Sequence, residues 1–350
     1  MIGALLIVIV LAVLVVFHDV LLIAFGGVLV AIVLDTFVRV IRSHIAMPRW
    51  SALLLSILIP GTLIVVGLVY GGAIIVRQYA ALQVAIPIAL QAGYHNLQAG
   101  PLAGLLPTTA LDLQPLLGSA VGFAQRATGL ISSGVGLLIG FGVMLFVGAC
   151  IAAEPTLYRD GIVLVVPPQH RRKARALLDE MGGTLAAWLS ARLVSMIVIA
   201  ALAAVGLSVL RIPYAVALGV LAGALAFIPN VGAFVAAVPA VILALAISPQ
   251  WAVLVLLMYW FVHTLDDFLV IPIAERRIVH LPPALTMLMQ LALGGTVGLL
   301  GVAFAAPLSA AMILMTRVLW IDTFSASAAL RAEQVILDER APQRVPDISG

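Results

Sequence analysis

Long apolar runs, separated by short polar stretches, extend along most of the chain up to about residue 320. A transmembrane helix needs roughly 20 apolar residues. The runs here are continuous, whereas the strands of a membrane barrel alternate apolar and polar residues. Because only helices and closed barrels satisfy their backbone groups inside lipid, the pattern predicts an all-α, polytopic helical integral membrane protein.

The first apolar run, 2–34, is too long for one span and is interrupted by His18 and Asp19. This interruption predicts two helices that meet at a polar extracellular turn. A basic loop over 35–50 and a span over 51–76 are expected to follow.

Residues 78–128 differ from their neighbours, because they contain four prolines and only two charged residues, Asp112 and Arg126. They are typical of short amphipathic helices at a membrane surface. A glycine-rich span is expected next. The polar stretch after it acquires helical spacing at Arg171, which predicts an interfacial helix that runs directly into a span from Leu193.

The hydrophobic blocks of the second half have the wrong lengths for simple spans. Residues 213–247 are interrupted at 229–232 by Pro-Asn-Val-Gly, and each half is short for a span. The block 283–320 is too long for one helix and carries glycines near its middle. Broken or re-entrant hairpins and pairs of tilted helices both fit these lengths.

Six parts are predicted along the chain. They are N-terminal transmembrane helices (1–77), an extracytoplasmic amphipathic segment (78–128), a transmembrane helix (129–153), a cytoplasmic or interfacial helix (154–192), a transmembrane core with two hairpins (193–320) and a cytoplasmic tail (321–350).

Composition agrees with a membrane protein. Charged residues make up 9% of the chain and hydrophobic residues 64%, whereas an ordinary soluble domain has roughly 25% charged residues. The net charge is +3, but the basic residues are scattered over short loops, which argues against nucleic-acid binding. Cys150 is the single cysteine, so no disulfide framework or thiolate metal site is expected.

Basic residues also predict the orientation of the chain. With the loop at 35–50 placed in the cytoplasm, 15 of the 18 lysines and arginines fall on the cytoplasmic side. The positive-inside rule therefore predicts a multi-pass protein of a bacterial inner membrane with both termini in the cytoplasm. The basic run 171–175 is expected to contact lipid headgroups.

The break at Pro229, Asn230 and Gly232 is the first candidate site. A helix that breaks inside a membrane exposes backbone groups that transporters use to bind solutes or ions. The alternative is a tight turn at the membrane surface, with Asn230 capping the next helix.

Three glycines, Gly294, Gly295 and Gly298, form a second candidate. They could allow helices to pack closely, which is the simpler interpretation, or mark the turn of a second hairpin that lines the same pathway.

Asp266 and Asp267 lie in an apolar run, and His263 precedes them by about one helical turn. Carboxylates inside a membrane are costly and usually functional, so these three residues are candidates for ion or proton coupling. The alternative places both carboxylates at the cytoplasmic interface, paired with Arg276 or Arg277.

Motifs for enzymatic chemistry are absent from the sequence. There is no phosphate-binding loop, no helical pair of zinc ligands and no nucleophile elbow. We therefore expect no catalytic residues, no metal and no cofactor, and a protein that is not an enzyme.

Four stretches of the second half resemble the AI-2E (autoinducer-2 exporter-like) permease family of bacterial inner-membrane proteins. Their order and spacing match the family, although Ala233 stands where many members carry a second proline. The stretches are LRIPYA (210–215), FIPNVGA with VPA (227–233 and 238–240), DDFLVIP through RR (266–277) and GGTVGLLG with AP (294–301 and 306–307).

The resemblance implies a transporter-like protein, described in the family as an exporter or permease, with some members assigned to cation/proton antiport. We expect export of a small polar solute, either a signalling molecule or a metabolite, driven by an ion gradient or by the gradient of the solute. A cation/proton antiporter and a non-transporting membrane scaffold are the alternatives. A homo-oligomer is also expected, because hairpins that do not span would otherwise expose polar backbone to lipid.

Overall fold

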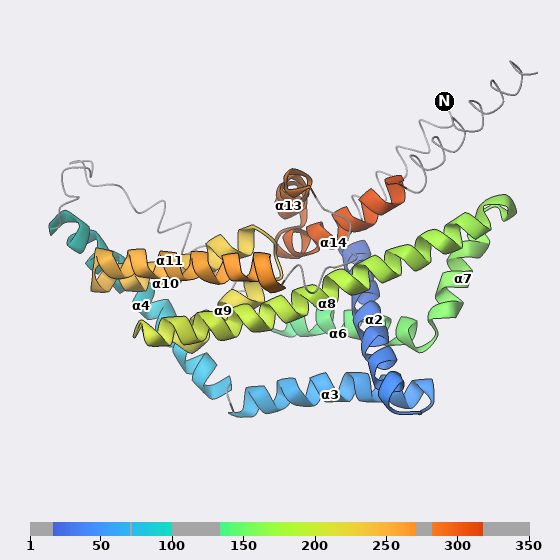
Figure 1. Cartoon of the computed structure of the whole chain (residues 1–350), viewed down its shortest axis with the longest axis horizontal. Coiled ribbons are helices and arrows are strands. Elements are labelled where there is room, and N and C mark those ends of the chain that lie inside the picture. The colour runs from blue at the N-terminus through green and yellow to red at the C-terminus, as the bar shows by residue number, and fades with distance from the viewer. Residues whose placement is uncertain (1–16, 71, 100–133, 271–281, 318–350) are drawn as a thin grey trace, which may run out of the picture.

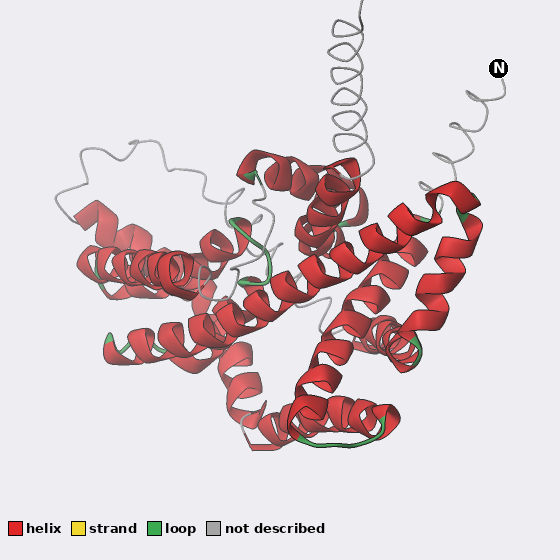
Figure 2. Ribbon diagram, turned by 45° about the vertical axis from the view of Figure 1, so that its right-hand side comes forward, coloured by secondary structure: helices red, strands yellow, loops and turns green. Residues whose placement is uncertain are grey.

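The computed structural model describes residues 17–70, 72–99, 134–270 and 282–317, and every regular element within them is helical (Figures 1 and 2). The α-helices are α2 (His18–His44), α3 (Arg49–Tyr70), α4 (Gly72–Ala99), α6 (Gly134–Ala153), α7 (Pro155–Val165), α8 (Arg171–Val209), α9 (Ala215–Leu225), α10 (Val231–Ile247), α11 (Pro249–Leu265), α13 (Pro283–Val297) and α14 (Leu299–Thr316). A 3₁₀ turn, η2 (Pro168–His170), precedes α8, and a π-helical turn, η3 (Asp266–Val270), follows α11.

Four of the described helical segments are long and apolar enough to cross a membrane: Val20–His44, Pro168–Val209, Pro249–Phe268 and Leu299–Thr316. A fifth apolar segment, α6, is followed by α7 after a bend of 87°. The protein is therefore a polytopic helical membrane protein, as the hydrophobic pattern predicts.

The longest helix, α8, has 39 residues and is about 58 Å long. It crosses the whole molecule diagonally in Figure 1. The interfacial helix and the span predicted on either side of residue 192 are thus one uninterrupted helix. The short α9 packs tightly along it, because a Cβ at Gly223 would lie 2.5 Å from the Met196 carbonyl oxygen of α8.

A core built largely of alanine and leucine joins α4, α9, α10 and α11 to the C-terminal half of α8, on the left of Figure 1. Two polar side chains of α4 reach into this group. The Asn96 amide donates to the carbonyls of Leu245 and Ala246, and the Gln78 amide oxygen accepts from the Ala217 backbone N–H. These contacts hold α4 against the α9–α10 hairpin.

On the other side of α8, the α2 helix packs against α6 and α3. The Arg49 guanidinium donates to Asp35 at 2.5 Å and to the Ala152 carbonyl at 2.9 Å. This single side chain therefore connects the start of α3 and the end of α6 to α2.

Two predicted boundaries in the first half are wrong. The predicted loop over 35–50 is helical as far as His44, because Val38 continues the buried face of α2 while the basic side chains project from its exposed face. The predicted end of a span near Arg77 falls inside α4, since α3 ends at Tyr70 and α4 begins at Gly72. The remainder of the predicted amphipathic segment, from residue 100, lies outside the described residues.

Candidate functional site

The first predicted break is a tight hairpin between α9 and α10. Asn230 has φ of 65°, and the Gly232 N–H donates to the Ile228 carbonyl at 3.1 Å. A Cβ at Gly232 would lie only 1.9 Å from the Leu225 carbonyl oxygen, so glycine is required where α10 begins against the end of α9. The Asn230 side chain is exposed and makes no capping hydrogen bond, contrary to the simpler interpretation of this turn.

The glycine cluster forms a second hairpin, between α13 and α14. Gly298, with φ of 77°, is the single residue between the two helices. Gly294 and Gly301 allow the helices to approach, because added Cβ atoms would lie 2.7 Å from Val302 and 2.3 Å from the Leu293 carbonyl. The cluster therefore forms both a close helix contact and the turn of a second hairpin, although Gly295 has no neighbour within 4 Å of an added Cβ. That this hairpin lines a pathway stays a prediction.

A glutamine connects the two hairpins. The Gln290 Nε2 of α13 donates to the Pro229 carbonyl, in the α9–α10 turn, at 3.0 Å. Gln290 is only 3% exposed, and its Oε1 is buried without a hydrogen-bond partner among the described residues.

The buried face of α13 is polar, and its outer face is apolar. Thr286 and Gln290, one turn apart, are its buried residues, whereas Met287, Leu288 and Leu291 are exposed. This arrangement suits a helix with lipid outside and a polar environment inside.

The two carboxylates occupy the π-helical turn η3 and point in different directions. Asp266 is 3% exposed and accepts a hydrogen bond from Ser195 Oγ of α8 at 2.5 Å. Asp267 is exposed, and it lies near enough to Arg192 and His263 to interact with them electrostatically.

Among the described residues, no hydrogen bond joins His263 to Asp266, because Asp266 turns toward Ser195 of α8. The His263 ring instead stacks on Tyr259, with centroids 6.5 Å apart. The His263 Nε2, the Tyr259 hydroxyl and the Asp266 Oδ1 are all buried without a hydrogen-bond partner in the described part of the chain. Buried polar atoms are nearly always satisfied, so this cluster is suited to receive water or an ion. Arg276 and Arg277, the alternative partners, lie outside the described residues.

One face of α8 connects the hairpins to the carboxylates. Trp188, Arg192 and Ser195 follow at helical spacing, with the Arg192 guanidinium 5.8 Å from the Trp188 ring centroid. Phe227, beside the first break, packs edge-on against Trp188 at 5.8 Å. The contact with the break and the contact with Asp266 are thus seven residues, or about 10 Å, apart along one helix.

Sequence reasoning did not find Ser195 or Gln290. Gln290 carried a usable signal, because it is an amide in a long apolar block. Ser195 carried none, since single serines are common in membrane helices and only its neighbour Asp266 distinguishes it. Among the described residues, no group of three or more His, Cys, Asp or Glu side chains could hold a metal ion.

Comparison with known proteins agrees with this architecture. The family described as AI-2E family transporter matches residues 4–319. Two proteins of Bacillus subtilis (strain 168) are similar over parts of their lengths. "Putative transport protein YrrI" is 25% identical over 159 residues, which are 45% of each chain. "Putative transport protein YueF" is 28% identical over 148 residues, which are 42% of this chain and 40% of that protein. These alignments thus span less than half the length of either relative. With nearly its whole length matched by the family, this chain belongs to the AI-2E family of transporters.

Proposed function

We propose that the protein is a permease that moves a small polar solute outward across a bacterial inner membrane, driven by an ion gradient or by the gradient of the solute. The observation that carries the proposal is the Gln290 amide held between two helical hairpins, with its Oε1 buried and without a hydrogen-bond partner among the described residues. A buried acceptor in an apolar bundle is costly unless a ligand or water meets it.

The solute pathway in this proposal runs between the hairpins. The Gln290 Oε1 is the acceptor left for a solute among the described residues, because the Pro229 carbonyl already accepts from the Gln290 Nε2 and from the Val231 N–H. Transporters of other folds bind solutes at such broken helices. A solute that carries an N–H or O–H donor fits this acceptor.

We assign the coupling of transport to an ion gradient to the Asp266 carboxylate beside α8. One Asp266 carboxylate oxygen accepts from Ser195, and the other, near His263, has no hydrogen-bond partner within the part of the chain that the structure describes. Ser195 and Trp188 share a face of α8, and Trp188 packs against Phe227 at the break. In this proposal, an ion or proton that binds Asp266 therefore changes the packing of Phe227 through α8.

The decisive experiment is transport by the purified protein in proteoliposomes with an imposed pH gradient. We expect Asp266→Asn to abolish gradient-driven uptake of a solute found in a screen, and Asp267→Asn to have a smaller effect because Asp267 is exposed. Glu180→Gln, an exposed carboxylate on α8, is the matched control and should transport normally. Unchanged gradient-dependent transport by the Asp266→Asn/Asp267→Asn double variant would refute the assigned coupling.

Cation/proton antiport is a second candidate, favoured by one observation. The Ser195 hydroxyl and the Asp266 carboxylate place two oxygen atoms 2.5 Å apart in a buried site, and oxygen atoms are the ligands of hard cations. The test is whether sodium dissipates a pH gradient across the proteoliposomes when no organic solute is present. Dissipation by the parent protein that is lost in Asp266→Asn would favour antiport over solute export.

A non-transporting membrane scaffold is distinguished from a permease by whether water reaches the break between α9 and α10. In a variant with Cys150 replaced by alanine, single cysteines at positions 229–231 should react with a membrane-impermeant thiol reagent if the break lines a pathway. Protection of all three positions from both sides would favour a scaffold.

We also propose that both termini lie in the cytoplasm and that the protein forms a homo-oligomer. Terminal reporter fusions test the first statement. The mass of the detergent-solubilised particle, measured by light scattering, tests the second.

A further inference from the structure

The short helix α7 does not continue the span that precedes it. It is bent by 87° from α6, and its 11 residues extend only about 16 Å, whereas the hydrocarbon core is about 30 Å thick. With α6 crossing the bilayer, α7 lies nearly parallel to the membrane plane.

The apolar face of α7 points outward, and its charged face points inward toward α8. Leu157, Tyr158, Ile162, Leu164 and Val165 are all exposed, the last by 86%, and at 100° per residue they cover an arc of roughly 160°. Only Val163 of this helix is buried.

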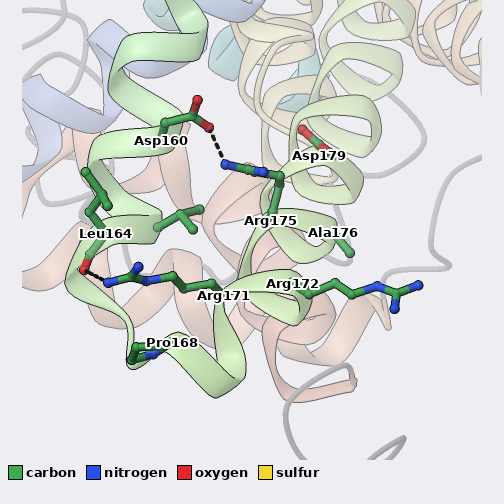
Figure 3. Close-up of a pocket in the computed structure, with 9 residues that line it drawn as sticks. Asp160, Leu164, Pro168, Arg171, Arg172, Arg175, Ala176 and Asp179 are labelled. Carbon is green, nitrogen blue, oxygen red and sulfur yellow. Dashed lines mark hydrogen bonds and ion pairs between the residues drawn. The ribbon is translucent and has the colours of Figure 1, made fainter.

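Two ion pairs hold the inner face of α7 on α8. Arg159 pairs with Asp179 at 2.7 Å, and Arg175 pairs with Asp160 at 3.0 Å, as Figure 3 shows for the second pair. The exposed apolar arc is therefore fixed in one direction, away from the protein.

The start of α8 carries three cations, Arg171, Arg172 and Lys173, without carboxylate partners among the described residues. Arg171 caps the end of α7 by donating to the carbonyls of Val166 and Leu164 at 3.1 and 3.2 Å. A pocket of about 790 Å³ lies between α7 and α8 and includes Arg171 and Arg172 in its lining, with Arg172 extending away from α7 (Figure 3).

We propose that α7 and the first turn of α8 form an anchor for anionic lipid. The outer face of α7 lies in the boundary between headgroups and acyl chains, and the three cations contact lipid phosphates. The apolar arc and the three cations are adjacent, which is the combination that an anionic bilayer surface complements. A second copy of this chain would complement the apolar arc but not the cations.

Spin labels test the position of α7 in the full-length protein. With Cys150 replaced by alanine, single cysteines at Ile162 and Val165 are labelled and the protein is placed in vesicles of equal parts phosphatidylcholine and phosphatidylglycerol. We expect both labels to collide more with oxygen than with a water-soluble nickel complex, and a label at the exposed Glu180 to show the reverse. Labels at 162 and 165 that favour nickel, or that are shielded from both reagents and broadened by a second copy, overturn the proposal.

The role of the cations is tested with the same label at Val165 by titrating phosphatidylglycerol into phosphatidylcholine vesicles. We expect Arg172→Gln and Lys173→Gln each to raise the phosphatidylglycerol fraction needed for half-maximal insertion about fivefold. Arg211→Gln removes an equal charge at the other end of α8 and should change nothing. An insertion depth that is independent of phosphatidylglycerol in the parent, or equal shifts in all three variants, would contradict headgroup binding by this cluster.

Discussion

Replacing Gly232 with alanine should destabilise the α9–α10 hairpin strongly. The new Cβ would lie 1.9 Å from the Leu225 carbonyl oxygen, and real Cβ atoms do not come closer than about 3.0 Å. The obstacle is backbone rather than a flexible side chain, so the two helices must separate by roughly 1 Å. Overpacking of a core typically costs 1–3 kcal/mol, and we expect about 3 kcal/mol here because no rotamer change can relieve the contact.

Thermal unfolding of the detergent-purified protein, followed by tryptophan fluorescence, measures this effect. At about 2 °C per kcal/mol for a large chain, the Gly232→Ala midpoint should fall by about 6 °C. Gly295→Ala is the matched control, since nothing lies within 4 Å of its Cβ and alanine favours helix by up to about 1 kcal/mol. Equal melting temperatures for the two variants would refute the close approach of α9 and α10.

Three further predictions concern polar contacts. Ser195→Ala should impair gradient-driven transport while leaving the fold intact. The control is Ser309→Ala, which should transport normally because the Ser309 hydroxyl donates to the Ala305 carbonyl of its own helix. Equal transport activity of the two variants would contradict a role for the Ser195 hydroxyl beside the buried carboxylate. Gln290→Leu should lower the free energy of unfolding by about 1 kcal/mol, because the Pro229 carbonyl loses one of its two donors and keeps the Val231 N–H. The same variant should lose most of its transport, and uptake and thermal unfolding measured on one preparation separate the two effects. Arg49→Met should lower the free energy of unfolding by about 1–3 kcal/mol, because two acceptors on neighbouring helices lose their donor. Arg39→Met, at an exposed ion pair, should lower it by less than about 0.5 kcal/mol. Equal losses for the two variants in denaturant titrations would show that the Arg49 contacts add nothing to stability.

The hydrophobic pattern was sufficient for the fold class and for both hairpins of the second half. Those hairpins were predictable because proline, asparagine and glycine interrupt apolar blocks at Pro229 and Gly298, and backbone chemistry allows few other residues there. The extent of α2 was not predictable from charge, since the sequence alone does not distinguish an arginine on the exposed face of a helix from an arginine in a loop.

The candidate site was only partly predictable. Asp266 stood out as a carboxylate in an apolar run, but its partner Ser195 lies 71 residues away in sequence. The link from Gln290 to Pro229 likewise depends on how two hairpins pack together, across 61 residues. Local patterns identify groups that need partners, whereas tertiary packing determines which partner each one receives.

Because α8 is so long, a small tilt of this helix displaces its far end by several ångströms. Its 39 residues extend about 58 Å, nearly twice the thickness of the hydrocarbon core, so a long arm projects from the site toward α7. From Ser195 to Arg171 that arm is about 36 Å, and a tilt of about 10° at the site moves its far end by about 6 Å. Because two ion pairs fasten α7 to this arm, a tilt of α8 at the site would carry α7 with it.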